Sequence, residues 1–159
     1  MIYFFIMDTP VGDLLLIKKD KILHTISFSN ETKKIRIDPT WKRDKNKFTK
    51  ETKEIKDYFS GKLKNFPDIP LPQGTDFQQK IWKALLDIPY GSTISYQDIA
   101  VAAGSPKACR AAGNALNTNP LPILIPCHRV IGKNGSLTGF GGGLSTKKYL
   151  LELEQKFSE

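Results

Sequence analysis

The chain is poor in the residues that hold small folds together covalently or through metals. Its 159 residues include only two cysteines, Cys109 and Cys127, and two histidines, His24 and His128. Two cysteines cannot build the disulfide framework of a small secreted domain. A tetrahedral zinc site would need all four side chains to converge, without the paired spacing that such sites usually show. We therefore expect neither a disulfide framework nor a bound metal.

Long apolar runs are also lacking. No segment approaches the roughly 18–20 apolar residues that a transmembrane helix needs. The apolar stretch at residues 1–7 has no basic leader and is too short for a secretory signal. Hydrophobic residues make up 40% of the chain and charged residues 25%, which excludes collagen-like, coiled-coil and disordered classes. We expect a soluble cytoplasmic protein with no membrane association.

Positive charge is in excess along the whole chain. Lysine and arginine number 24 against 16 acidic residues, a net charge of +8. Residues 1–72 carry 15 basic and 10 acidic groups, and residues 73–159 carry 9 and 6. The excess favours a polyanionic partner such as nucleic acid, but its even spread argues against a basic tail. The basic cluster at residues 42–50 is more typical of a solvated loop and helix start than of a phosphate contact.

The first part of the chain has the pattern of an antiparallel meander followed by a helix. Three short apolar segments rich in β-branched and aromatic residues predict strands: Ile2–Met7, Leu14–Ile17 and Ile22–Phe28. His24 falls within the third of these and is expected to be an ordinary sheet residue. A helix is predicted over Lys50–Phe59, ended by Gly61. The proline-rich stretch at 66–74 then predicts a linker, which divides the chain into domains 1–72 and 73–159.

The second part has helical periodicity. Thr75 and Gln78 have capping-box spacing, and five apolar residues then recur at helical intervals: Phe77, Ile81, Ala84, Leu85 and Ile88. Ser95 and Asp98 repeat the capping-box spacing at the start of a second helix, which Gly104 ends. Each of these two helices is therefore expected to bury one face.

A third helix is predicted close behind the second. Ser105 is a candidate N-cap, Pro106 suits a first helical position, and the helix should run from Lys107 to about Leu116. Two short helices joined by a short glycine-containing turn are typical of a helix-turn-helix, although an ordinary helical hairpin fits the pattern equally well. The third helix is rich in alanine and glycine, and Arg110 is its one long cation. Such a surface suits close approach to a DNA backbone or a shallow groove with little sequence preference.

The segment from Pro120 to Val130 is the most unusual in the chain. The apolar run at 123–125 lies between prolines and predicts buried extended chain. Cys127 and His128 follow it directly. A thiol whose proton an imidazole accepts is a nucleophile, whereas a buried structural cysteine with a histidine pointing elsewhere is the plainer interpretation. Spacing alone leaves these two interpretations open.

The motif Pro126-Cys127-His128-Arg129-Val130 resembles the active-site pentapeptide of the O6-alkylguanine-DNA alkyltransferases, also called methylated-DNA–protein-cysteine methyltransferases. The resemblance covers residues 75–155. Four further segments agree with that family in order and spacing: Tyr90–Gln97, Ala103–Ala111, Asn119-Pro120 and Gly142–Leu144. The resemblance implies an α/β N-terminal domain, with an antiparallel sheet plus helix of ribonuclease-H-like type. A mainly α-helical, winged-helix-like domain with a helix-turn-helix would follow it.

The resemblance also implies a reaction. Cys127 would be the nucleophile that accepts the alkyl group of O6-alkylguanine, and of O4-alkylthymine, irreversibly and once per molecule. His128 would take the thiol proton through a water, and Glu154, rather than its neighbour Glu152, would hold His128. Tyr96 would donate to the guanine ring nitrogen as the base leaves. No cofactor would be required.

The remaining implied roles concern the base and the DNA. The carbonyls of Cys127 and Val130 would accept from the guanine amino group, and Asn119 would brace the turn beneath the pocket. Leu116, Pro122, Phe140 and Gly141 would line the alkyl pocket. Arg110 would fill the gap left by the flipped nucleotide, while Ser95, Lys107, Ala111 and Gly113 contact the minor groove of double-stranded DNA. The protein would act as a monomer, in the nucleus if it is eukaryotic.

Two positions depart from the commonest family pattern, and three other functions compete. Phe140 stands where a tyrosine is frequent and Gly141 where a larger side chain is frequent, which predicts a roomier pocket that tolerates bulky adducts.

A non-catalytic damage sensor of the same family would lack Cys127. A helix-turn-helix regulator would carry base-reading side chains on its second helix. A cysteine hydrolase would need a base from a distant segment, and His24 is the only other histidine.

Overall fold

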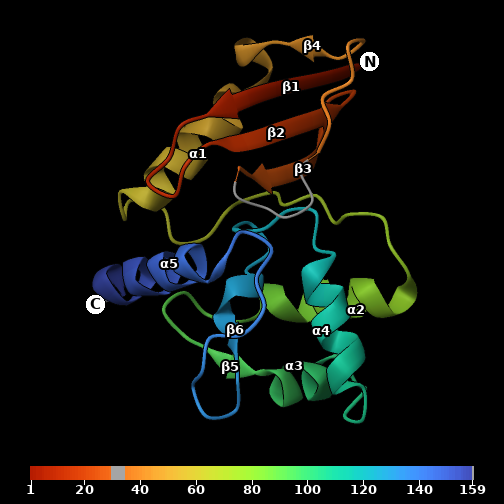
Figure 1. Ribbon diagram of the computed structural model, residues 1–159, viewed down its shortest axis with the longest axis vertical. Coiled ribbons are helices and arrows are strands. Elements are labelled where there is room, and N and C mark those ends of the chain that lie inside the picture. The colour runs from red at the N-terminus through yellow and green to blue at the C-terminus, as the bar shows by residue number, and fades with distance from the viewer. Residues whose placement is uncertain (30–34, 159) are drawn as a thin grey trace.

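The N-terminal part of the protein is a small sheet. The computed structural model describes residues 1–29 and 35–158. Its strands β1 (Ile2–Met7), β2 (Leu14–Lys19) and β3 (Ile22–Phe28) are antiparallel neighbours, which confirms the predicted meander. The sheet has the order β3-β2-β1-β4 (Figure 1).

Strand β4 (Lys42–Arg43) was not predicted. It pairs in parallel with β1 through Tyr3 and Phe4, in the stretch for which the sequence indicated only a loop and a helix start. Both of its side chains are exposed, so it carries no apolar alternation that could have marked it as a strand.

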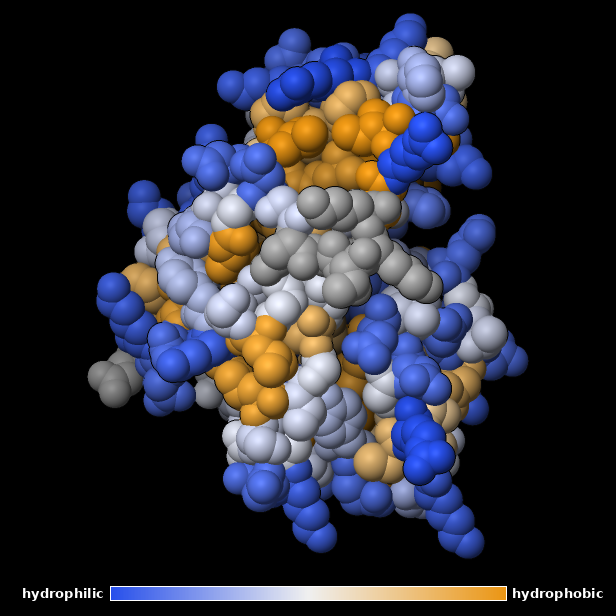
Figure 2. Space-filling model, in the orientation of Figure 1, coloured by the Kyte–Doolittle hydropathy of each residue, from blue (hydrophilic) through white to orange (hydrophobic). Residues whose placement is uncertain are grey.

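One helix packs on this sheet. A short 3-10 helix, η1 (Lys45–Phe48), leads into α1 (Thr49–Phe59), close to the predicted bounds. Leu14 and Leu16 are fully buried on one face of β2, whereas Leu15 between them is only half-buried. This is the alternation expected of a sheet that carries a helix on one side. Figure 2 shows apolar side chains gathered at the surface over β1 and β2 as well, with a hydrophilic band beside them along β4.

The C-terminal part is mainly helical. It contains α2 (Asp76–Leu86), α3 (Tyr96–Ala102), α4 (Cys109–Asn117), the 3-10 helix η2 (Cys127–Arg129) and α5 (Leu144–Phe157). Strands β5 (Ile94–Ser95) and β6 (Val130–Ile131) pair in parallel beside them. The predicted capping boxes at Thr75 and Ser95 are both present, because each side chain accepts from the backbone N–H three residues on. None of the helices in the described ranges is long and apolar enough to cross a bilayer.

The start of α4 corrects a prediction. The helix begins at Cys109 rather than Lys107, and Ser105 does not cap it. The N–H of Ala108 donates to the carbonyl of Ser105, so residues 105–108 form a separate turn. The Gln97 side chain donates to the Pro106 carbonyl at 2.8 Å and ties this turn back to α3. The connection between the two helices is therefore longer than the sequence indicated.

The apolar run before the cysteine corrects a second prediction. Residues 123–125 are buried, as expected, but they form a turn rather than extended chain. Ile123 has a positive φ of 77°, which is unusual for a β-branched residue, and Ile125 donates to the Leu121 carbonyl at 2.9 Å. The prolines on either side thus enclose a tight turn that ends at Cys127.

The two parts of the molecule meet along β3. In Figure 1 this strand is the edge of the sheet that faces the C-terminal helices, while β4 lies at the far edge. The N–H of Ile26 donates to the Pro120 carbonyl at 2.8 Å, which joins the sheet edge to the chain leaving α4. The cysteine segment therefore lies at the junction of the two parts.

Candidate active site

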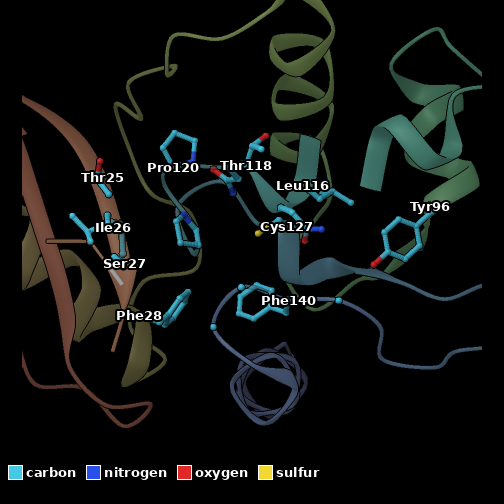
Figure 3. A pocket seen from close by; sticks show the side chains of 17 residues that line it. Thr25, Ile26, Ser27, Phe28, Tyr96, Leu116, Thr118, Pro120, Cys127 and Phe140 are labelled. Carbon is cyan, nitrogen blue, oxygen red and sulfur yellow. The ribbon is translucent and has the colours of Figure 1, made fainter. Parts of the chain in front are cut away.

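A cavity of about 300 Å³ opens at this junction. Seven of the predicted site residues line it: Tyr96, Leu116, Asn119, Pro122, Cys127, Phe140 and Gly141. Residues 25–28 of β3 form the opposite wall, so both parts of the chain contribute (Figure 3). The sequence thus predicted the C-terminal side of the cavity but gave no sign of the wall from β3.

Cys127 is held rigidly at the base of this cavity. It is the first residue of η2 and is 8% exposed, and Figure 3 shows its sulfur directed toward the wall formed by β3. Asn119 fixes the preceding turn from both sides: its amide donates to the Ile125 carbonyl at 2.8 Å, and its oxygen accepts from the Leu121 N–H at 2.9 Å. The thiol is therefore presented from a backbone with little freedom to move.

The neighbouring histidine is paired with a carboxylate. His128 Nε2 lies 2.6 Å from Glu154 Oε2, and both side chains are buried. Glu152, the rival carboxylate, is exposed and lies 3.9 Å from Lys148 instead. His128 Nδ1 is buried and makes no hydrogen bond within the described chain. With Nε2 donating to the carboxylate, the lone pair on Nδ1 is available to accept a proton.

The charges of this pair follow from their surroundings. Burial alone would raise the pKa of Glu154, but the hydrogen bonds and charges of His128 and Arg129 outweigh it and lower that pKa to about 2. Burial lowers the pKa of His128 below its ordinary value, although Glu154 opposes the shift. At neutral pH the pair is a neutral imidazole held by an ionised carboxylate, which is the arrangement of a general base.

Three further residues complete the site, and the sequence analysis gave none of them a role. Arg129 donates to both oxygens of Glu154, with Nε–Oε1 at 2.7 Å and Nη2–Oε2 at 3.0 Å. The Tyr58 hydroxyl, from α1, donates to Oε2 at 2.6 Å. Lys147 is buried on α5, seven residues before Glu154, and this spacing puts both charges on the same apolar helix face. That placement was a signal in the sequence, whereas nothing local marked Tyr58.

Lys147 joins strand β6, which follows the cysteine segment, to the loop that contains Thr138. Its ammonium donates to the carbonyls of Val130 at 2.6 Å and Thr138 at 2.8 Å. Burial lowers the pKa of Lys147, and the nearby thiolate of Cys127 opposes that shift. Val130 was predicted to offer its carbonyl to the guanine amino group. In the structure Val130 is buried, does not line the cavity, and its carbonyl accepts from Lys147.

A glycine-rich loop, residues 139–143, closes one side of the cavity through aromatic packing. The Phe140 ring lies 5.5 Å from the Phe28 ring, centroid to centroid. A Cβ at Gly142 would lie 2.6 Å from the Phe28 ring, so the loop can approach β3 this closely only with glycine at that position. Gly141 is exposed at the rim, which leaves the opening of the pocket free of a side chain.

The residues predicted to meet DNA lie on α4, in the turn before it and at the start of α3. Lys107, Arg110 and Ala111 are exposed, whereas Gly113 is half-buried and a Cβ there would lie 3.9 Å from the Tyr96 ring. Ser95 is the N-cap of α3 and half-buried. The Tyr96 hydroxyl donates to the Thr138 carbonyl at 3.3 Å and accepts from the Thr138 hydroxyl at 2.9 Å. The helix pair is therefore connected to the cavity through Tyr96.

The other candidate groups lie apart from this site. His24 is exposed on β3, with Nδ1 2.9 Å from the Thr25 hydroxyl oxygen. Cys109 is half-buried at the start of α4. Across residues 1–29 and 35–158, no three His, Cys, Asp or Glu side chains converge as metal ligands would.

Fold and site together define a class of protein. Its thiol faces a cavity, a buried histidine–carboxylate pair lies beside the thiol, and a helix-turn-helix lies next to the cavity. The DNA-binding domain model of the family described as 6-O-methylguanine DNA methyltransferase matches residues 76–156, and its ribonuclease-like domain model matches residues 2–73. The chain belongs to this family.

Individual relatives agree over nearly the whole chain. A methylated-DNA–protein-cysteine methyltransferase of Methanosarcina barkeri is 46% identical over 153 residues, which cover 96% of this chain and 97% of that relative. One of Mycobacterium tuberculosis is 44% identical over 159 residues, covering 98% and 93%. The crystal structure of the M. tuberculosis protein OGT in complex with DNA superposes with a TM-score of 0.89, at 42% identity and 98% and 94% coverage.

Proposed function

We propose that this protein repairs DNA by direct reversal, transferring the alkyl group of O6-alkylguanine in double-stranded DNA irreversibly to Cys127. The observation that carries the proposal is the Cys127 thiol at the base of a cavity of about 300 Å³, followed in sequence by a histidine that a buried carboxylate holds at 2.6 Å. O4-alkylthymine carries its alkyl group on a similar exocyclic oxygen and is proposed as a second substrate.

The groups of the site supply each part of the reaction. His128 Nδ1 takes the proton of the thiol, directly or through a water, and the carboxylate of Glu154 stabilises the imidazolium. The thiolate attacks the alkyl carbon, so that a carbon–sulfur bond forms while the bond from carbon to O6 breaks. The electron pair stays on guanine, where the Tyr96 hydroxyl donates to the ring nitrogen until a proton restores the normal base. The thioether is stable, so each molecule acts once and no cofactor takes part.

DNA must deliver the base to this cavity. An alkyl group on O6 points into the duplex, so the nucleotide has to be flipped out before a thiol can reach it. We propose that α3 and α4 lie in the minor groove, where the small residues Ala111 and Gly113 permit close approach and Arg110 fills the vacated stack. Ser95 and Lys107 would contact the adjacent backbone. The protein would act as a monomer wherever the DNA is kept, in the cytoplasm of a prokaryote or the nucleus of a eukaryote.

The alkyl pocket would lie between Leu116, Pro122 and Phe140. Because Gly141 places no side chain at its rim, we propose that bulky adducts are accepted as well as methyl groups. Transfer from an O6-benzylguanine duplex should therefore proceed at a rate comparable with transfer from the methyl adduct. A benzyl rate lower by orders of magnitude would contradict the roomy pocket without affecting the reaction itself.

Intact-protein mass spectrometry tests the function. After incubation with a duplex containing one O6-methylguanine, the protein should gain one methyl group per molecule. Cys127→Ala should gain none, whereas Cys109→Ala, the matched removal of the other cysteine, should gain one as the wild type does. Tight binding to the duplex with no mass gain in the wild type would favour a damage sensor instead.

A further inference from the structure

One oxygen of the buried carboxylate is shared by groups from both parts of the molecule. Glu154 Oε2 accepts from His128 Nε2 at 2.6 Å and from Arg129 Nη2 at 3.0 Å, which are both close in sequence to Cys127. It also accepts from the Tyr58 hydroxyl at 2.6 Å, which comes from α1, 96 residues away in the sequence. The N-terminal domain thus reaches the pair that handles the proton of the thiol.

The position of Tyr58 is fixed by packing. Its side chain is fully buried, and its ring lies 5.4 Å from that of Phe59, 5.5 Å from that of Phe66 and 6.3 Å from that of Tyr90, centroid to centroid. Burial, and then the charge of Glu154, raise the pKa of Tyr58. The hydroxyl therefore stays protonated at neutral pH and can donate to the carboxylate.

A second tyrosine, half-buried, offers a comparison with Tyr58. The Tyr90 hydroxyl is buried near the same carboxylate but makes no hydrogen bond within the described residues. The site therefore tolerates an unpaired hydroxyl beside Arg129, whereas the hydroxyl of Tyr58 is aimed at the oxygen that holds the histidine. A donor at that oxygen restrains the carboxylate and withdraws part of its charge from the imidazole.

We propose that Tyr58 is a positioning residue for alkyl transfer, which fixes the Glu154 carboxylate so that His128 keeps its hydrogen on Nε2 and presents Nδ1 to Cys127. The inference rests on the proposed function and deepens it. It gives the N-terminal domain a part in the chemistry, in addition to the wall that β3 lends to the cavity.

The effect of removing this hydroxyl has a defined sign. In Tyr58→Phe the carboxylate keeps more of its negative charge toward the imidazole, which favours the protonated histidine and raises the pH below which His128 stops acting as a base. The charged and titratable groups around this pair remain in place in the variant: Arg129 and Lys147 near His128, and Arg129 and Tyr90 near Glu154. The change can therefore be assigned to the one hydroxyl.

Single-turnover transfer from an O6-methylguanine duplex, measured from pH 5 to 9, tests the proposal. On the acid limb of the profile Tyr58→Phe should transfer about tenfold more slowly than the wild type at the same pH, equivalent to about one unit of pKa, and the two profiles should converge at alkaline pH. Binding to the duplex should be unchanged. Tyr149→Phe removes a tyrosine hydroxyl from the exposed surface of α5, where the ring lies 6.3 Å from that of Phe59, and should behave as the wild type.

A second measurement covers the case in which the variant is less stable. The chain has only two histidines, so a ¹⁵N titration of histidine-labelled protein resolves His128 from His24. In Tyr58→Phe the titration of His128 should move to higher pH, while that of His24 stays in place. A normal rate and acid limb, or a slower rate explained by lost folded protein with His128 titrating as in the wild type, would overturn the proposal. If the wild type itself transfers no methyl group, the proposed function fails, and the titration still decides whether Tyr58 tunes His128.

Discussion

The two parts of the molecule bury different kinds of side chain. Among the described residues, the buried polar and charged positions of the C-terminal part are His128, Arg129, Thr146, Lys147 and Glu154, whereas the N-terminal part buries only Ser27. Buried charges cost free energy unless they are paired, so a fold keeps them where they serve a purpose. The comparison separates a domain held together by apolar packing from one that carries buried charge, and Tyr58 of the first donates to Glu154 of the second.

The most damaging change should be loss of the charge on Glu154. Glu154→Gln leaves Arg129 buried without a full counter-charge, so the free energy of unfolding should fall by about 3–5 kcal/mol. Alkyl transfer should slow by at least about 100-fold, because His128 loses its charged partner. Urea unfolding and single-turnover kinetics measure the two effects. Glu152→Gln, on the exposed face of the same helix, should change neither, and equal stability of the two variants would refute the role of the buried carboxylate.

A change in the apolar domain should act on stability alone. Leu16 of β2 is fully buried, and Leu16→Ala should lower the free energy of unfolding by about 2–5 kcal/mol through the cavity it leaves. The transfer rate of the molecules that remain folded should not change, since Leu16 does not line the cavity at Cys127. Denaturation curves and single-turnover kinetics below the unfolding transition test this. A large loss of transfer rate in the folded fraction would contradict the prediction that the apolar part affects stability alone.

The smallest expected effect is on the pH dependence of stability. Because burial lowers the pKa of His128 in the folded protein, the unfolded chain takes up this proton first. The stability that depends on the neutral imidazole is fully present above about pH 6.5 and is lost as the pH falls below it, by up to about 1.4 kcal/mol per pH unit. Glu154 acts in the same direction at lower pH, between its ordinary value of 4.5 and about 2.

Urea unfolding between pH 7.5 and 5 measures this slope. His128→Gln should flatten it, whereas His24→Gln, which replaces the exposed histidine of β3, should keep it. Equal slopes in both variants would show that the buried histidine does not set the acid sensitivity.

Local signals in the sequence predicted the elements that depend on neighbouring residues. The capping boxes at Thr75 and Ser95 need only side chains three residues apart, and the meander needs only alternation and short turns. Strand β4 was missed because its two exposed residues gain their structure from pairing with β1. The start of α4 was misplaced because the Gln97 side chain, from the preceding helix, holds the turn before it.

The candidate site shows the same difference between residues marked by local sequence signals and residues brought in by distant contacts. Cys127, His128 and Glu154 were identified through the family motif, and the cavity gathers Tyr96, Leu116 and four of their predicted companions around the thiol. The contribution of Tyr58 had no signal, because a hydroxyl on an ordinary amphipathic helix finds its partner only when the two domains pack. The wall from β3 was missed for the same reason.

Transfer of an isotopic label from DNA to the protein tests the central claim most directly. A duplex carrying one O6-(trideuteromethyl)guanine would be incubated with the wild-type protein, which is then digested and mapped, while the DNA is analysed for restored guanine. The account predicts one labelled methyl group on the peptide containing Cys127 for every guanine restored. A label on Cys109, or restored guanine without any label on the protein, would contradict it.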